Sequence, residues 1–417
     1  MKRVREWLRQ LGPGLITGAA DDDPSGIATY SQAGARFGFL TLWTIVFTYP
    51  LMVGIQLVSA RIGRVTGRGL ASNIRRNFPR PVLYAVVVLL VVANTVNIAA
   101  DIAAMGEALE LVVGGPPHGY AVLFGVLCLL LQVLMPYRRY VRYLKWLTLA
   151  LLSYVLVLLT VHIPWGLVAA HSVRPHLALG PDYLTVVVAV FGTTISPYLF
   201  FWQAAQEVEE LTADPAAGAL AHAPEGAARH LRRIKIDTYL GMAFSNVVAF
   251  CIMLATAATL NAGGVTDIQT SAQAAEALRP LAGDFSFLLF ALGIIGTGLI
   301  AVPVLAGSAA YAVTESFEWR RGLDLKLLEA REFYAIIALA TLGGVALDFS
   351  PIDPIQALFW SAVANGVIAV PIMVVMMLLA DDRKVMGGFT VTRRLKTLGW
   401  LATATMAAAV AAMFATR

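Results

Sequence analysis

The hydrophobic pattern of the chain consists of apolar runs far longer than those of a soluble protein. Residues 82–93 and 148–161, for example, are largely apolar. A helix needs about 20 such residues to cross a bilayer core of roughly 30 Å, so these runs are typical of membrane spans. The pattern predicts eleven transmembrane helices, at 12–34, 41–62, 82–106, 119–135, 144–163, 183–211, 236–258, 286–312, 332–347, 355–379 and 396–415.

The composition supports this class of protein. Apolar residues make up 58% of the 417 residues and charged residues only 14%, whereas soluble domains average about 45–50% and about 25%. Both cysteines, Cys128 and Cys251, lie inside apolar runs, so no disulfide framework is indicated. We therefore expect an all-α polytopic membrane protein whose surroundings are a lipid bilayer. The net charge of +5 comes from loops between spans, so no nucleic-acid partner is predicted.

Basic residues gather in alternate loops and so predict the orientation. One set of loops holds the clusters at 2–9, 64–80, 138–142, 229–235, 320–331 and 383–394, whereas the other holds only a few, such as Arg36, Arg174 and Arg279. Loops rich in Lys and Arg stay in the cytoplasm. The chain is therefore predicted to be a multi-pass protein of a bacterial inner membrane, with its N-terminus in the cytoplasm and its C-terminus outside.

Two of the predicted spans are interrupted by polar residues and proline. The first contains Asp21-Asp22-Asp23-Pro24-Ser25-Gly26, and the sixth contains Gly192-Thr193-Thr194-Ile195-Ser196-Pro197-Tyr198. Proline removes a backbone donor and disfavours helix at the preceding residue. Inside a membrane such breaks are tolerated where the freed backbone is buried in protein or lines a cavity. We therefore expect helices 1 and 6 to be discontinuous.

The spacing of the two breaks predicts an internal repeat. Five spans separate the starts of the first and sixth helices, so the second unit enters the membrane from the opposite side. Interrupted helices at matching places in two halves indicate a transporter site. We expect one five-helix repeat at 1–163, a second, inverted repeat at 183–379 and an additional helix at 396–415. The sequence does not determine the oligomeric state, although a monomer satisfies this architecture.

The acidic residues of the first break predict a cation as cargo. An aspartate in mid-helix costs about 2.5–3.5 kcal/mol on insertion scales, so a charged residue there is a functional candidate. Half-helices that end near Ala20 and Thr194 also present free carbonyls and the negative ends of their dipoles. Carboxylate, carbonyl and hydroxyl oxygens are hard ligands, which suit Mg²⁺, Mn²⁺ and Ca²⁺. No cofactor is predicted besides this transported ion.

These motifs resemble the Nramp family of proton-coupled divalent-metal transporters. The family's first-helix motif, Asp-Pro-Gly-Asn after a Gly-Pro-Gly, corresponds to Asp23-Pro24-Ser25-Gly26 after Gly12-Pro13-Gly14. Its sixth-helix Met-Pro-His corresponds to Ser196-Pro197-Tyr198, and its eighth-helix pattern to Phe290-Ala291-Leu292-Gly293 and Leu305-Ala306-Gly307. The resemblance extends from the first to the tenth helix. It implies the leucine-transporter fold and transport by alternating access.

The resemblance also implies the site, with informative departures. The metal-binding Asp corresponds to Asp23, whereas the family's Asn and Met ligands fall at Gly26 and Ser196. Asn365 falls where the family has a metal-proximal Gln. The acidic break and the resemblance together predict the metal residues Asp21, Asp22, Asp23, Ser196 and Asn365, of which Asp21 and Asp22 are additions to the family's motif. The predicted lining residues are Ala20, Gly26, Thr193, Thr194 and Tyr198.

The departures indicate a harder and more acidic site than that of the main family. Ser196 stands where the main family has Met, so the soft thioether ligand that favours transition metals is absent. In this respect the site resembles that of the Nramp-related magnesium transporters. The family's sixth-helix His is Tyr198 here, and the segment 333–347 lacks a basic residue associated with the proton route. We therefore expect transport of Mg²⁺, Mn²⁺ or both, with weak or no proton coupling.

Other polar residues inside spans allow two interpretations each. Asn97 and Asp101 lie on one face of the third helix, with Asn94 one turn before. They line a permeation path or form hydrogen bonds between helices. Gln203 allows the same two roles, of which hydrogen bonding is favoured. For the three glutamates at 207, 209 and 210 a solvated helix end is favoured over an acidic exit for the ion.

Three other functions are considered as alternatives to a magnesium or manganese transporter with weak proton coupling. A proton-coupled Mn²⁺/Fe²⁺ transporter of the main Nramp type keeps the same motifs. A sodium/organic-solute symporter shares the architecture, but its carboxylate site requires neutral residues and free half-helix N-termini. An intramembrane aspartyl protease requires two facing aspartates, and no flanking motif supports Asp23 with Asp101 as such a pair. We therefore do not expect an enzyme.

Overall fold

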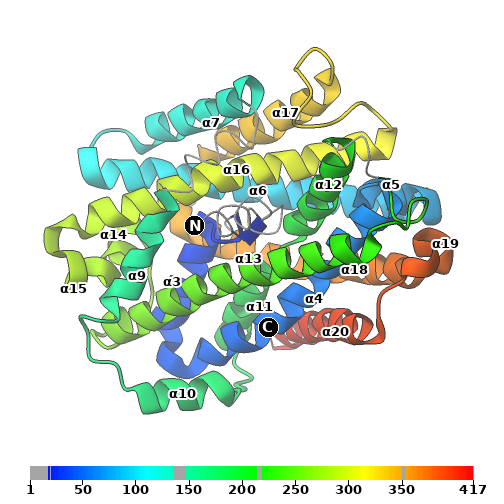
Figure 1. The fold of residues 1–417 in the computed structure, drawn as a ribbon. Helices are drawn as coiled ribbons and strands as arrows, with labels where there is room; N and C mark the ends of the chain where they lie inside the picture. Colours follow the sequence, from blue (N-terminus) through cyan, green and yellow to red (C-terminus); the bar gives the residue numbers. More distant parts are fainter. Residues whose placement is uncertain (1–16, 19, 136–146, 214–217, 350–352, 417) are drawn as a thin grey trace, which may run out of the picture.

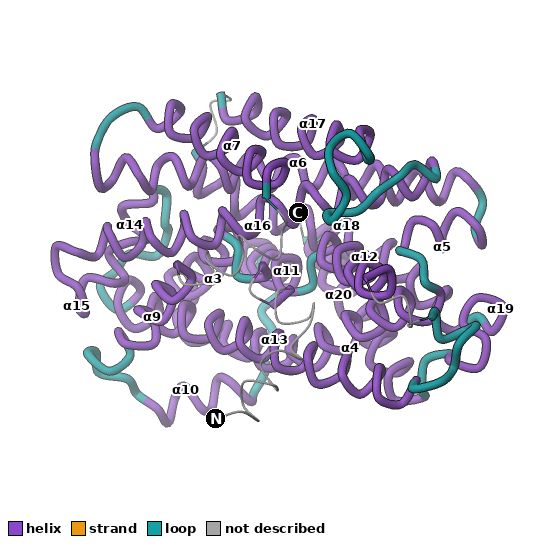
Figure 2. The backbone as a smooth tube through the Cα atoms, turned by 45° about the horizontal axis from the view of Figure 1, so that its top comes forward, coloured by secondary structure: helices purple, strands orange, loops and turns teal. Residues whose placement is uncertain are grey.

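The computed structural model describes residues 17–18, 20–135, 147–213, 218–349 and 353–416. Within these ranges every regular element is a helix (Figure 2). The first half contains α3 (Pro24–Phe37), η1 (Gly38–Thr41), α4 (Leu42–Thr66), α5 (Leu70–Asn77), α6 (Arg80–Val113), α7 (Pro117–Leu134), η2 (Leu147–Leu151), α9 (Leu152–Val157) and α10 (Trp165–Val173).

The second half is helical as well. Its elements are α11 (Pro181–Thr194), α12 (Pro197–Ala213), α13 (Ala227–Thr256), η3 (Ala257–Asn261), α14 (Ser271–Ala275), η4 (Glu276–Leu278), α15 (Arg279–Ala282), η5 (Gly283–Phe285), α16 (Ser286–Phe317), α17 (Arg331–Asp348), α18 (Pro354–Asp381), α19 (Arg383–Met386), η6 (Gly387–Phe389) and α20 (Arg393–Ala415).

Eight helical stretches among the described residues are long and apolar enough to cross a membrane. One of them, Pro24–Thr66, contains the second part of the predicted first span and the predicted second span, which η1 separates. The predicted first span begins at residue 12, outside the described residues. Two predicted spans are not among the eight. The span at 144–163 begins outside the described residues and continues as η2 and α9, and the span at 332–347 corresponds to α17, whose ends carry three charged residues.

Both predicted helix breaks are present. The helix that includes residues 20 and 21 stops before Asp23, and α3 starts at Pro24. Likewise α11 ends at Thr194 and α12 starts at Pro197. Proline is favoured at the first position of a helix because its missing N–H group would have no partner there. The discontinuous first and sixth helices are thus confirmed.

The broken helices lie in the interior of the bundle. The membrane-crossing window of Pro181–Ala213 is 100% buried, whereas those of α7 and α20 are only 28% buried. Figure 1 shows α7 and α20 at opposite margins of the molecule, with α3 and α11 between them. Helix α3 packs against α11, α13 and α18, and α6 packs against α16, α17 and α18. Polar groups at the breaks are therefore shielded from lipid.

Candidate metal site

Asp23 is the residue on which the two breaks converge. Its backbone is extended (φ −71°, ψ 170°), and it forms the N-cap of α3. One carboxylate oxygen, Oδ1, accepts a hydrogen bond from the backbone N–H of Gly26 at 2.7 Å. An N-cap carboxylate satisfies an orphan donor and lies at the positive end of the helix dipole. Oδ2 is left to face the neighbouring helices.

Oδ2 of Asp23 lies between α6 and the second break. The side-chain amide of Asn97, on α6, donates to it at 3.2 Å. The hydroxyl of Tyr198, on α12, lies 3.3 Å from the same oxygen and 3.0 Å from the carbonyl oxygen of Ala20. A carboxylate, a free helix-end carbonyl and a phenol therefore meet where the two broken helices approach. All of these residues are buried.

A hydrogen-bonded network extends from Asp23 to two other helices. The amide nitrogen of Asn97 also donates to Oδ2 of Asp101 at 3.2 Å. On α18, Ser361 and Asn365 donate to the amide oxygen of Asn97 at 2.9 and 3.3 Å. The structure thus brings Asp23, Asn97, Asp101 and Asn365 together. Asn94 stands apart from them, since it donates to the Leu305 carbonyl and the Ser308 hydroxyl on α16.

Asp21 and Asp22 face a different helix from Asp23. The Ser245 hydroxyl, on α13, lies 2.5 Å from Oδ2 of Asp21 and 3.0 Å from Oδ1 of Asp22. The three consecutive aspartates therefore do not point into one cluster. Consistently, no group of three His, Cys, Asp or Glu side chains in the described ranges is arranged to hold a metal ion. A site at Asp23 would combine one carboxylate with neutral oxygen ligands.

The hydroxyls of the second break are bound to their own helix. Ser196 Oγ lies 2.8 Å from the carbonyl oxygens of Gly192 and Thr193. The hydroxyl of Thr194 donates to the Val190 carbonyl and lies 3.4 Å from the Tyr30 hydroxyl. The Ser196 hydroxyl therefore lies against two of the last four carbonyls of α11, which have no partner within the helix.

Gly26 lies against the other break. A Cβ atom on Gly26 would lie 3.3 Å from Thr193 Oγ1 and 3.5 Å from the Asp21 carbonyl oxygen. The position that carries Asn in the main family therefore packs closely on the second break in this chain.

The predicted path residue Gln203 lies in a separate polar chain along α12. Its side chain accepts a hydrogen bond from Thr17 at 2.7 Å and donates to Glu207 at 3.4 Å. The Glu207 side chain has no exposed surface and forms an ion pair with Arg233, on α13, at 2.8 Å. Arg233 also pairs with Glu210. The favoured interpretation of Glu207 as part of a solvated helix end is therefore wrong, because Arg233 neutralises it in the interior.

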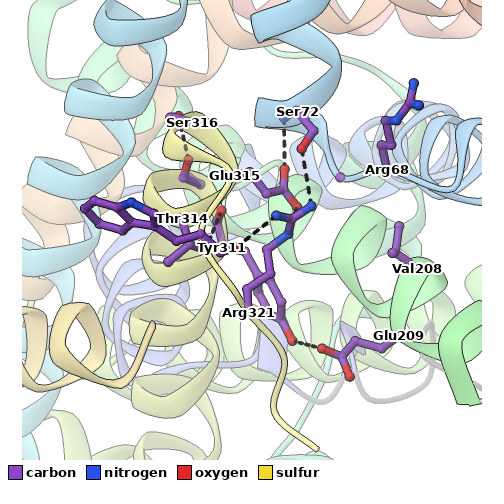
Figure 3. Close-up of polar contacts among 12 residues, drawn as sticks. Arg68, Ser72, Val208, Glu209, Tyr311, Thr314, Glu315, Ser316 and Arg321 are labelled. Carbon is purple, nitrogen blue, oxygen red and sulfur yellow. Dashed lines mark hydrogen bonds and ion pairs between the residues drawn. The ribbon is translucent and has the colours of Figure 1, made fainter. Parts of the chain in front are cut away.

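A cavity of about 680 Å³ lies beside α12, between this helix and the segment that follows α16. Figure 3 shows its polar wall. Glu209 accepts hydrogen bonds from the Tyr311 hydroxyl at 2.6 Å and from the Leu323 N–H at 3.2 Å. Glu315 accepts from the Ser72 N–H at 3.1 Å and lies 3.6 Å from Arg321. Glu209 and Glu315 are therefore engaged in contacts with other segments of the chain.

Sequence reasoning missed two serines that contact the predicted residues. Ser361 lies one helical turn before Asn365, so the spacing of four could have revealed it. Ser245 carried no comparable signal, because a serine in an apolar helix most often forms hydrogen bonds between helices.

The family of this chain is shown by its similarity to known proteins. The profile of the family described as "Natural resistance-associated macrophage protein-like" matches residues 14–416. The "Divalent metal cation transporter MntH" of Deinococcus radiodurans is 29% identical, with 95% of this chain and 87% of that protein covered. The protein of the same name from Klebsiella pneumoniae is 27% identical, with 94% and 90% covered.

Solved structures agree on the fold. A mutant of the Eremococcus coleocola manganese transporter gives a TM-score of 0.75 at 19% identity, with 97% of this chain and 86% of that chain covered. MhsT in complex with L-phenylalanine gives 0.54 at 12% identity, with 97% and 98% covered. The predicted leucine-transporter fold is confirmed. The chain is a multi-pass membrane protein that belongs to the Nramp family of transporters, which are not enzymes.

Proposed function

We propose that this protein transports a divalent metal cation across the membrane by alternating access. The observation that carries the proposal is the meeting of the Asp23 carboxylate, the Ala20 carbonyl and the Tyr198 hydroxyl at the two helix breaks. Carboxylate and carbonyl oxygens at a break in a membrane helix form a cation site. Membership in the Nramp family and the names of the two MntH relatives support the same function.

Mn²⁺ is the first candidate for the transported ion. The solved relative from Eremococcus coleocola is named a manganese transporter, which favours the main Nramp type over the magnesium branch. The oxygens that meet at the breaks, from the Asp23 carboxylate, the Ala20 carbonyl and the Tyr198 hydroxyl, also suit Mn²⁺, because all are hard ligands. Mg²⁺ is the second candidate. It is supported by Gly26 and Ser196, which stand where the family has its Asn and Met ligands.

Among the residues around the breaks we propose Asp23 as the principal ligand, with the carbonyl of Ala20 beside it. Asp21 and Asp22 form a second acidic pair, which faces Ser245 on α13. Asp101 lies beyond Asn97 and lines the path that leads from the site. Weak or absent proton coupling is proposed from Tyr198, which replaces the family's His.

The membrane arrangement is proposed from the charged loops. The N-terminus lies in the cytoplasm of a bacterium and the C-terminus outside its inner membrane. Inverted repeats at 1–163 and 183–379 surround the site, 396–415 forms an additional helix, and a monomer suffices for transport. The bacterial sources of the MntH relatives support this location.

Ion uptake into proteoliposomes tests the proposal. Purified protein would be assayed with Mn²⁺, Mg²⁺, Ca²⁺ and Zn²⁺, and a pH-sensitive dye inside would report proton movement. We expect uptake of Mn²⁺ that is lost in Asp23→Ala and retained in Asp284→Ala, which removes an exposed carboxylate that is not part of the network. Absence of flux for every divalent ion would overturn the proposal. Acidification of the liposome interior driven by Mn²⁺ would refute only the proposal of weak or absent proton coupling.

A further inference from the structure

Asn97 has an unusual position in the network because every hydrogen-bonding site of its amide is used. Its nitrogen donates to two carboxylates, those of Asp23 and Asp101, each at 3.2 Å. Its oxygen accepts from Ser361 at 2.9 Å and from Asn365 at 3.3 Å. The residue has no exposed surface. Three helices, α3, α6 and α18, are thus joined through one side chain, whose nitrogen meets both carboxylates and whose oxygen meets the two donors of α18.

The partners determine which edge of the Asn97 amide faces Asp23. Ionised carboxylates only accept hydrogen bonds, so they require the NH₂ edge. The opposite edge meets donors from α18. The Ser361 hydroxyl shares its single proton with the Leu358 carbonyl at 2.7 Å, whereas Asn365 contributes an NH₂ group. Asn365 is therefore the main donor that fixes the orientation of Asn97.

Asn97 in turn fixes the carboxylate of Asp23. The N-cap bond from Gly26 holds Oδ1, and the Asn97 bond holds Oδ2. With both oxygens restrained, the carboxylate has one orientation before an ion arrives. Groups that orient a metal ligand from behind contribute strongly to metal affinity, about 10- to 100-fold in known sites.

We propose that Asn97 is a positioning residue for the cation, and that Asn365 and Ser361 act through it from α18 and are not themselves ligands. The proposal rests on the proposed function, since it concerns the same site. It replaces the expectation from the sequence that Asn365 contacts the metal ion. Because α18 also packs against α3 and α11, a displacement of α18 would release Asn97 and so weaken the hold on Asp23.

Asn365→Asp distinguishes positioning from ligation. A carboxylate is a better ligand for a hard cation than an amide, so a direct ligand role predicts a lower KM for Mn²⁺. A positioning role predicts the opposite. The new acceptor would repel the Asn97 oxygen and turn its NH₂ edge away from Asp23, and KM would rise about tenfold or more. Asn365→Gln keeps the donor and should stay within about threefold of the wild type.

Ser361→Ala provides the second variant, with Ser308→Ala as its matched control. Both serines are buried and hydrogen-bonded to an asparagine of α6, Ser361 to Asn97 and Ser308 to Asn94. Loss of one hydrogen bond predicts about a two- to tenfold rise in KM for Ser361→Ala. We expect Ser308→Ala to leave KM unchanged, because Asn94 lies outside the Asp23 network.

The readouts are KM and Vmax of Mn²⁺ uptake, with Mn²⁺ binding to the purified, folded variants measured by calorimetry. The proposal is supported if KM rises and Mn²⁺ binding weakens in Asn365→Asp and Ser361→Ala but not in the controls Asn365→Gln and Ser308→Ala. A lower KM in Asn365→Asp, an unchanged KM in Ser361→Ala, or an equal rise in Ser308→Ala would overturn it. Failure of the proposed function is recognised separately, because the wild type would then neither bind nor take up Mn²⁺.

Discussion

Replacing Gly192 with alanine is expected to force apart two helices that meet beside the second break. Gly192 lies in the last turn of α11, and a Cβ atom there would lie 2.0 Å from the carbonyl oxygen of Ala362 and 2.5 Å from the backbone nitrogen of Gly366. Both contacts are to the backbone of α18. No side chain can therefore rotate away to make room for the methyl group.

The size of the displacement follows from these distances. Cβ atoms essentially never approach another heavy atom closer than 3.0 Å, so the contact at 2.0 Å requires a shift of at least 1.0 Å between α11 and α18. Overpacking of this kind typically costs about 1–3 kcal/mol of stability. The shift would also move Asn365, which precedes Gly366, and so disturb the network at Asp23.

Thermal unfolding and Mn²⁺ uptake of the purified variant measure both effects. We expect a lower unfolding midpoint and a higher KM for Gly192→Ala. Gly166→Ala is the matched control, because it also lies in a helix and a Cβ atom there would meet nothing within 4 Å. If Gly192→Ala matched the wild type in both measurements, the close packing of α11 on α18 would be refuted.

Three further substitutions test separate parts of the site. Tyr198→Phe removes the hydroxyl that lies 3.3 Å from Asp23 and should raise the Mn²⁺ KM about two- to tenfold without loss of folded protein; an unchanged KM would exclude a role for this hydroxyl. Arg233→Met leaves Glu207 buried without its ion-pair partner at 2.8 Å, so it should destabilise the protein by about 3–5 kcal/mol in chemical denaturation, and a loss under about 1 kcal/mol would contradict the pairing. Ser196→Met introduces a soft thioether and should strengthen competition by Cd²⁺ against Mn²⁺ uptake; equal competition would show that this position does not face the ion.

The helix breaks could be predicted from the sequence because their signal is local. Proline after polar residues in an apolar run stops a membrane helix whatever surrounds it. The same local signal located Asp23 and Ser196. The ninth predicted span, α17, is harder to recognise from its composition, because charged residues at both of its ends weaken its apolar signal.

The partners of the aspartates could not be predicted in the same way. Which helix each carboxylate faces depends on how α3 is rotated against α6 and α13, and no local pattern encodes that rotation. The sequence therefore grouped Asp21 and Asp22 with Asp23, whereas the structure directs the first two towards Ser245. It also left open whether Asn97 serves transport or helix packing, a question that its contacts with Asp23 and Asn365 now make testable.

The measurement that tests the central claim most directly is Mn²⁺ flux through the purified protein and its Asp23→Ala variant, reconstituted side by side in liposomes that contain a Mn²⁺-quenched dye. We predict saturable quenching with the wild type, and quenching no faster than that of empty liposomes with Asp23→Ala, although both proteins are equally folded and inserted. Equal flux through the two proteins would contradict the assignment of the cation site to the break in the first helix.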